Sequence, residues 1–248
     1  CFERYDPVST GPNLIPWCEM VYFHQFGDME RLHKIFPVLC SYYKWLKLNR
    51  TWRNGMYWSS GWGTGMDNMP RVPSEYSMIF SHGHMIWLDT NLQQLFIANL
   101  LLEMGFYLER WQEIEEFEDE VEHLKKYIRE NLWDEETGFL YDQYADGSLC
   151  KTKGIGAYWA LYSDVLNDEQ TMRLVKELDG FLAISFHVQS TLMPLVQRLS
   201  KLFIQVIEQD TTVIMYHMRQ ILIMVQNMVF LKYVINVILN VVSIRILP

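Results

Sequence analysis

The chain of 248 residues has only four cysteines, and they lie far apart. There is no CxxC spacing and no paired-histidine pattern, so the sequence predicts neither a metal site nor any other cofactor. Basic charge is also scarce, because the formal net charge is −9 at pH 7 and no basic stripe is present. This balance argues against a nucleic-acid partner and favours a neutral or weakly charged ligand.

The N-terminus has no charged segment followed by an apolar one, so no signal peptide can be read there. A cytoplasmic location is therefore the expectation. The chain begins with Cys1 rather than methionine, and we expect its N-terminus to be truncated.

The last 68 residues contain no tryptophan and no glycine, whereas residues 1–180 contain all nine tryptophans and all 13 glycines. Isoleucine and valine show the opposite trend, with 20 in residues 181–248 and 15 in residues 1–180. Net charge changes as well, from −12 in the first segment to +3 in the second. We therefore predict one domain segment over residues 1–180 and, over residues 181–248, a tail whose origin the composition leaves open.

Three interpretations of the tail are open. Residues 221–247 are apolar enough to suggest a membrane anchor, but polar residues interrupt them, and Lys232 near the centre would cost roughly 2.5–3.5 kcal/mol on insertion. A membrane partner is therefore not expected. The tail can instead be a packing segment, or a non-native continuation from a shifted reading frame. We favour the last interpretation, because the family resemblance described below stops near residue 180.

Residues 57–71 hold one acid among tryptophans, glycines and an arginine, a combination typical of a sugar-binding cleft. Glycines let the backbone turn tightly and approach a ligand closely. Indole rings stack on the apolar faces of sugars, while arginine and asparagine hydrogen-bond their hydroxyls. The alternative is an aromatic-rich loop packed on a helical core. Aromatic residues of a core and of a binding pocket cannot be told apart from the sequence alone.

The segment GMDN followed by PR, within residues 65–71, resembles the SGMDN.PR motif of the alpha-toroid glycoside hydrolases of family sixty-three, including mannosylglycerate-hydrolase-like proteins and, more distantly, trehalases. Four further segments resemble that family in the same order, and together the matches span about 170 residues. These segments are NLIPW at 13–17, WLD with a later Gln at 87–93, TGFLYD at 137–142 and KTKGIGAYW at 151–159.

The resemblance implies a mainly α fold, namely part of an (α/α)6 toroid of the six-hairpin glycosidase type with a small β-hairpin. The chain is too short for a whole toroid, so a fragment is expected. Apolar spacing predicts two helices within residues 14–48, separated at Gly27-Asp28 and interrupted by Pro37, with Asp28 as an N-cap.

A further helix is predicted over residues 90–104, with Asp89 as its cap and Gly105 as its stop. Residues 111–132 form another, and its acidic run is predicted to be a solvated outer face. Alternation around Asp146-Gly147 predicts the β-hairpin.

The implied reaction is inverting hydrolysis of an α-linked glucoside or mannoside, in a substrate such as an oligosaccharide, a mannosylglycerate-like or a trehalose-like compound. Asp67 matches the general acid of the family, and neighbouring tryptophans would raise its pKa. The alternative is an aspartate that caps a turn. Neither Glu208 nor Asp210 lies in the context of the general base, so this chain is expected to be incomplete and inactive.

The resemblance and the residue chemistry together predict a small-carbohydrate site. Its substrate-binding residues are predicted to be Trp58, Trp62, Asn68, Arg71, Asp89, Gln93 and Lys153.

Several of these residues have a structural alternative. Arg71 can form a structural ion pair, Lys153 can face solvent, and helix capping explains Asp89. Two other functions also stay open. One is a non-catalytic carbohydrate-binding relative, and the other is a sugar epimerase of the same architecture that uses His82 or His84. Local hydrogen bonding to the backbone is the alternative role of these histidines.

Overall fold

The computed structural model describes residues 10–66 and 69–177. All of them belong to one of the two units into which the chain divides, Cys1–Gly180. The predicted tail, residues 181–248, and the membrane interpretation of residues 221–247 lie outside the described residues. Among the helices described, none is both long enough and apolar enough to cross a membrane.

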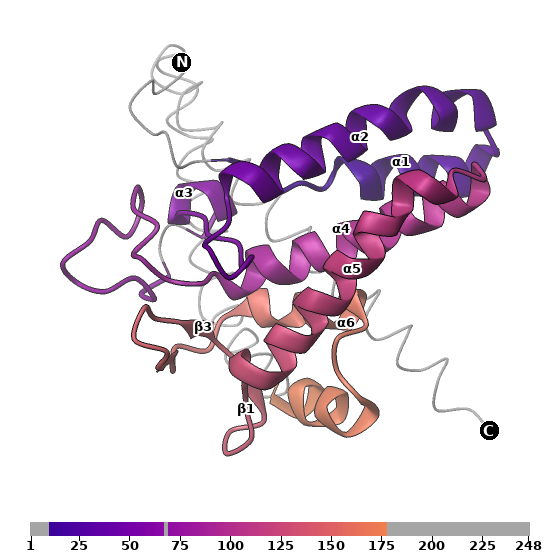
Figure 1. Ribbon diagram of the computed structural model, residues 1–248. Coiled ribbons are helices and arrows are strands. Elements are labelled where there is room, and N and C mark those ends of the chain that lie inside the picture. The colour runs from indigo at the N-terminus through magenta and orange to yellow at the C-terminus, as the bar shows by residue number, and fades with distance from the viewer. Residues whose placement is uncertain (1–9, 67–68, 178–248) are drawn as a thin grey trace, which may run out of the picture. The chain divides into compact units, whose positions relative to one another are not determined.

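The first two helices are α1 (Ile15–Phe26) and α2 (Met29–Asn49), which run alongside each other in Figure 1. Gly27 ends α1 in a left-handed conformation with φ 64°, and the Asp28 carboxylate accepts a hydrogen bond from the Arg31 N–H at 2.9 Å. The predicted break and cap are therefore confirmed.

The predicted interruption at Pro37 was wrong, since this residue lies inside α2. A proline inside a helix removes a backbone hydrogen bond. Here the neighbouring Phe36, Leu39 and Cys40 are buried, and their packing holds the helix together across the proline.

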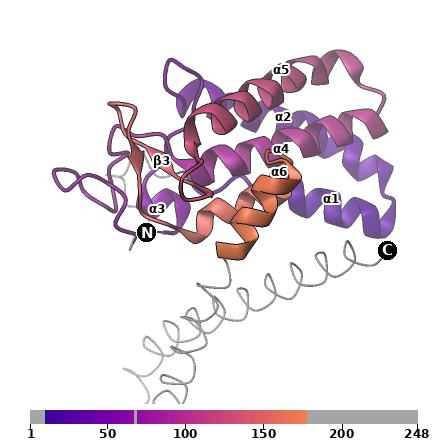
Figure 2. The same ribbon diagram turned by 90° about the horizontal axis from the view of Figure 1, so that it is seen from below.

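Helix α4 (Leu88–Tyr107) contains the main core of the described residues and contacts α1, α2, α5 and the later helical segments. Figure 2 shows it running between α5 and α6. The predicted stop at Gly105 was wrong, because α4 continues for two more residues. A Cβ on Gly105 would lie 2.1 Å from Cγ2 of Ile114, so the glycine is needed for close helix packing rather than for termination.

Helix α5 (Trp111–Tyr127) packs along α4 and continues into a short π-helix, Ile128–Leu132. Most of its acidic residues are exposed, as predicted. Glu120 is the exception, with 3% of its surface exposed. Its carboxylate accepts a hydrogen bond from the Tyr57 hydroxyl at 2.8 Å and pairs with Lys47 at 2.7 Å, which compensates its burial.

Two small antiparallel hairpins follow. Strands β1 (Trp133–Asp134) and β2 (Phe139–Leu140) form one, and β3 (Asp142–Gln143) and β4 (Leu149–Cys150) form the other around the predicted turn. The chain then enters a 3-10 helix, Ile155–Trp159, and α6 (Ala160–Ser163). The described residues are thus mainly helical with small β-hairpins, as expected for part of an alpha-toroid.

Candidate functional site

The predicted general acid, Asp67, and the predicted substrate-binding residue Asn68 lie outside the described residues. The chain on both sides of them is described. Before them is the short helix α3 (Gly61–Thr64), whose N-cap Ser60 accepts a hydrogen bond from the Gly63 N–H at 3.1 Å. Gly65 then turns the chain with φ 71°, a conformation that favours glycine.

After the gap, Arg71 is almost fully buried, with 2% of its surface exposed. Its Nη2 donates to Oδ2 of Asp89 at 2.8 Å and to the Thr64 hydroxyl at 3.0 Å. Its Nη1 donates to Oδ1 of Asp142 at 3.4 Å, and the guanidinium lies 4.0 Å from the Trp87 ring centre. We call Arg71, Asp89 and Asp142 the Arg71 cluster.

The charges of the Arg71 cluster are strongly coupled. Burial by itself lowers the pKa of Arg71, but attraction to Asp89 and then Asp142 raises it above its ordinary value, so the side chain is a permanent cation. Burial raises the pKa of Asp142 to about 6, although Arg71 opposes the shift. This geometry favours the ion-pair role of Arg71, which holds the chain just after Asp67 against α4 and β3.

Asp142 was missed as a site residue, although it ends the TGFLYD segment noted in the sequence. Its Oδ1 accepts a hydrogen bond from the Leu88 N–H at 2.7 Å, at the first residue of α4. The predicted cap by Asp89 was therefore wrong: Asp89 is the second residue of the helix, and a carboxylate from β3 satisfies the helix start.

The two predicted tryptophans differ in their surroundings. Trp58 is half-buried, with the Arg50 guanidinium 5.0 Å and the His82 ring 5.3 Å from its ring centre. Trp62 on α3 is 55% exposed and packs beside Phe80 at 6.0 Å.

The histidine pair is held by a local hydrogen bond. Nδ1 of His82 accepts a bond from the backbone N–H of His84 at 3.0 Å. Burial, together with the neighbouring His84, lowers the pKa of His82. This is the local role that the sequence left open for the pair.

Lys153 pairs with Glu177 and lies 5.3 Å from the ring centre of Phe139. It is not among the lining residues of the two pockets described next. The smaller pocket, of about 220 Å³, lies beside the Arg71 cluster.

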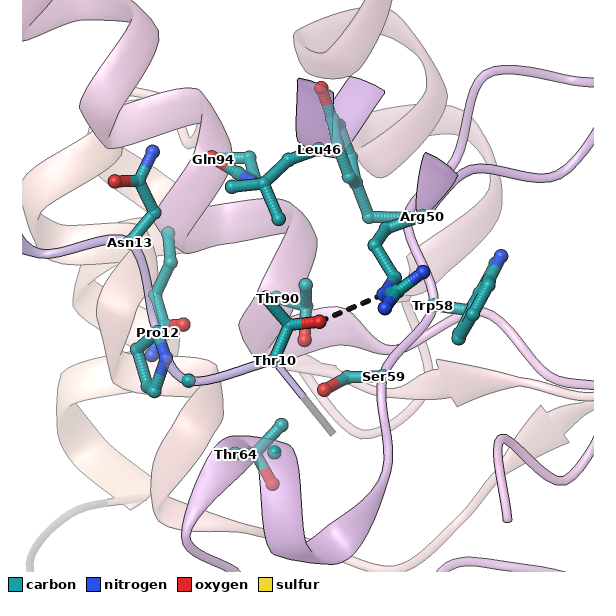
Figure 3. Close-up of a pocket in the computed structure, with 14 residues that line it drawn as sticks. Thr10, Pro12, Asn13, Leu46, Arg50, Trp58, Ser59, Thr64, Thr90 and Gln94 are labelled. Carbon is teal, nitrogen blue, oxygen red and sulfur yellow. Dashed lines mark hydrogen bonds between the residues drawn. The ribbon is translucent and has the colours of Figure 1, made fainter. Parts of the chain in front are cut away.

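The larger pocket opens to solvent, and the space within it and at its mouth together amounts to about 400 Å³ (Figure 3). Trp58 and Gln93 both line it, so two of the predicted substrate-binding residues share this pocket. Thr64 also lines it and bonds Arg71, which places the pocket next to the segment that leads to Asp67. The Arg50 Nε donates to the Thr10 hydroxyl at 2.8 Å at its rim.

Two further amides line this pocket that sequence reasoning missed. Asn13 and Gln94 are each only 4% exposed. Both amide atoms of Asn13, and Oε1 of Gln94, have no hydrogen-bond partner among the described residues. Asn13 lay within the NLIPW segment, but nothing in the sequence pattern indicated that its amide would be left unpaired.

This arrangement of helices and hairpins is shared with glycoside hydrolases of known structure. A GH63 mannosylglycerate hydrolase from Thermus thermophilus in complex with glucose superimposes with a TM-score of 0.58 at 21% identity, covering 68% of this chain and 51% of that one. The same enzyme with Tris and D-glycerate gives a TM-score of 0.59 at 19% identity, covering 71% and 57%. The fold is therefore that of an alpha-toroid glycoside hydrolase domain.

The family model of the mannosylglycerate hydrolase MGH1-like glycoside hydrolase domain matches residues 9–194, and the chain belongs to this family. The match extends past residue 180, where the sequence resemblance was expected to end.

An uncharacterised protein of Borreliella burgdorferi is 24% identical over 167 residues, which cover 67% of this chain and 33% of that protein. The chain thus spans about a third of that relative and about half of the Thermus structures.

Proposed function

We propose that this chain is part of an inverting glycoside hydrolase that cleaves an α-linked glucoside or mannoside, with Asp67 as the general acid. The observation that carries the proposal is the family match over residues 9–194, which includes the GMDN and PR residues at 65–71. Asp67 gives its proton to the glycosidic oxygen as the bond to the anomeric carbon breaks.

The surroundings of the gap support this role for Asp67. Thr64 and Arg71 flank Asp67 in sequence and are joined by a hydrogen bond of 3.0 Å. Arg71 is in turn tied to α4 through Asp89 and to β3 through Asp142. A catalytic acid needs a rigid support to meet its substrate in a productive orientation, and these contacts supply one on the C-terminal side of Asp67.

Inverting hydrolysis also needs a second carboxylate that activates water. Neither Glu208 nor Asp210 lies in the sequence context of that base, so we propose that this chain by itself binds sugar but does not hydrolyse it. A small anion can replace the missing base. Azide would attack the anomeric carbon from the face opposite the leaving group, while Asp67 protonates the departing oxygen, and a β-glycosyl azide would result.

The test is to incubate the chain with a disaccharide α-glucoside or α-mannoside and sodium azide, and to identify the product by NMR. We expect the β-glycosyl azide from the wild-type chain and none from Asp67→Asn, since an alkoxide leaving group needs the proton. If both proteins form equal amounts of the glycosyl azide, Asp67 is not the proton donor and the proposal is wrong.

The second candidate is a non-catalytic carbohydrate-binding relative. It is favoured by the pocket lined by Trp58 and Gln93, two of the predicted substrate-binding residues. Sugar binding without a glycosyl azide from either protein would support this candidate and contradict the hydrolase proposal.

A further inference from the structure

The loop from Ser81 to Met85 has an unusual backbone. Gly83 and His84 are both left-handed, with φ 60° and φ 51°. Glycine adopts this conformation freely, but it is uncommon for a residue with a side chain such as histidine. Such a conformation persists only where the surrounding contacts hold it, and it occurs often at sites that switch between states. The contacts of this loop must therefore supply the stabilisation that its backbone lacks.

Two tryptophans outside the loop hold its backbone. The Trp87 Nε1–H donates to the His82 carbonyl at 3.0 Å, and the Trp52 Nε1–H donates to the Met85 carbonyl at 2.9 Å. Within the loop, Nδ1 of His82 accepts a bond from the His84 N–H at 3.0 Å, which closes a turn over the left-handed backbone. This turn therefore depends on an imidazole, a group that titrates near neutral pH.

The His82 side chain also contacts Trp58, a predicted substrate-binding residue. The imidazole lies edge-on to both Trp58 and Trp52, with ring centres 5.3 and 5.1 Å away. The Arg50 guanidinium lies 5.0 Å from the Trp58 ring centre, and Figure 3 shows these two side chains next to each other. The loop therefore helps to fix the position of a tryptophan that lines the larger pocket.

Protonation of His82 is incompatible with its bond to His84. A neutral imidazole has one nitrogen that accepts a hydrogen bond, whereas an imidazolium donates from both nitrogens. A proton on Nδ1 of His82 would point at the His84 N–H, so the bond would be replaced by two opposed donors. The two ring centres are 4.6 Å apart, and charge on both rings would add repulsion.

The groups around His82 determine the direction of its titration. Burial, and then repulsion from His84, lower the pKa of His82 below its ordinary 6.5. The nearby contacts include a second cation, Arg50 on Trp58, and the phenol of Tyr76, whose ring centre is 5.2 Å from that of His84. Because the unfolded chain takes up the proton first, the stability that neutral His82 contributes is lost as pH falls from about 6.5 through the lowered pKa.

We propose that residues 81–85 form a pH-sensitive switch, which holds Trp58 in place at neutral pH and releases it in mild acid when His82 is protonated. The switch goes beyond the proposed glycosidase function, because its two states exist without substrate. Its consequence for sugar binding does rest on that function. If Trp58 contacts the sugar, affinity should fall as the switch opens.

The test uses the full chain, the variant His82→Asn and the matched control His33→Gln. The amide oxygen of asparagine can take the place of Nδ1 as the acceptor for the His84 N–H, but it does not titrate. His33 is an exposed histidine on α2. The indole N–H signals of Trp52 and Trp58 are followed by NMR from pH 7.5 to pH 5 and are assigned with the variants Trp52→Phe and Trp58→Phe.

We expect both tryptophan signals of the wild-type chain to move together, with a midpoint below pH 6.5, and to stay in place in His82→Asn. His33→Gln should behave as the wild type does. One pH unit below the midpoint, about a tenth of the chains keep the closed loop, so the affinity for methyl α-D-mannopyranoside or methyl α-D-glucopyranoside should fall about tenfold. The affinity of His82→Asn should fall less. Titration of Asp67 would affect both proteins equally, so the difference belongs to the switch.

Tryptophan signals that do not move with pH in the wild-type chain, or that move equally in His82→Asn, would overturn the switch. If His82→Asn does not fold, His84→Asn provides the second measurement. Asparagine tolerates the left-handed conformation, and this variant removes the imidazole that lowers the pKa of His82. Its midpoint should therefore lie at higher pH than that of the wild type, and an unchanged midpoint would contradict the proposal.

The switch and the proposed function can fail separately. Formation of the glycosyl azide at pH 7 without any movement of the tryptophan signals would leave the proposed function standing while the switch fails. Tryptophan signals that titrate as expected in a chain that forms no glycosyl azide would do the reverse.

Discussion

The Arg71 cluster and the pocket lined by Asn13 and Gln94 are both buried and polar, yet they differ in how their groups are satisfied. In the Arg71 cluster, opposite charges meet within 2.8 and 3.4 Å, and of its described side-chain atoms only Nε of Arg71 is left without a partner. In the pocket, neutral amides are buried to a similar degree and left unpaired. Similar burial therefore accompanies paired charges in one region and unpaired amides in the other.

The two regions also differ in what they connect. The Arg71 cluster joins the segment after Asp67 to α4 and to β3. Loss of its ion pairs should therefore lower the free energy of unfolding. The pocket lies among the segment before α1, the C-terminal part of α2 and the first turns of α4, and its unpaired amide atoms hold none of these together. Replacing one of these unpaired amides by an apolar side chain should therefore change stability little.

The largest effect that tests this comparison is expected from Arg71→Leu. The variant leaves Asp89 and Asp142 buried without their cation, and breaking a buried ion pair in this way costs about 3–5 kcal/mol. The free energy of unfolding, measured in urea, should fall by that order. The control Lys34→Ala removes an exposed pair with Glu30 and should change stability little. A loss in Arg71→Leu as small as in the control would show that the cluster is not structural.

A smaller effect is expected from the titration of Asp142. Its pKa in the folded chain is about 6, above the ordinary 3.8, so the folded state holds the proton over a range in which the unfolded state releases it. Its contribution to stability is therefore complete at low pH and is lost as pH rises from about 4 to about 6, by an amount on the order of 1–3 kcal/mol.

The measurement compares the wild-type chain with Asp142→Asn, which keeps an acceptor for the Leu88 N–H but does not titrate. Urea unfolding from pH 4 to pH 7 should show the wild-type chain losing stability relative to the variant as pH rises. Parallel pH profiles for the two proteins would contradict the raised pKa of Asp142.

Some local features of this fold were predicted correctly from local signals in the sequence. Gly27-Asp28 marked a helix boundary because a left-handed glycine and a capping carboxylate act within one turn. The interruption predicted at Pro37 and the helix end predicted at Gly105 were wrong, because the effect of each residue depends on tertiary neighbours that the local sequence pattern does not show. Buried side chains hold α2 across the proline, and Ile114 on α5 fills the space beside Gly105.

The site was predicted only in part for the same reason. Residue type indicated sugar chemistry at Trp58 and Gln93, and both line the pocket. Whether Asn13 is paired, or whether Asp142 reaches α4 from a hairpin 54 positions along the chain, depends on tertiary contacts that one sequence does not display. The family resemblance supplied the order of motifs but not the role of each polar group.

The smallest effect concerns Thr64, which belongs to both regions because it lines the pocket and accepts a bond from Arg71 at 3.0 Å. Thr64→Val keeps the shape of the side chain and removes this acceptor, so it should destabilise the chain by about 1 kcal/mol. Urea unfolding of Thr64→Val, Asn13→Leu and the double variant then measures whether the two regions are coupled.

We expect the two changes in unfolding free energy to add within about 0.5 kcal/mol, as they do for sites that share no partner. Asn13 makes no hydrogen bond through its amide to the described residues, so the loss of the Thr64 acceptor changes nothing that Asn13 holds in place. A large coupling energy in unfolding would instead join the pocket and the Arg71 cluster into one structural network, and the distinction between them would fail.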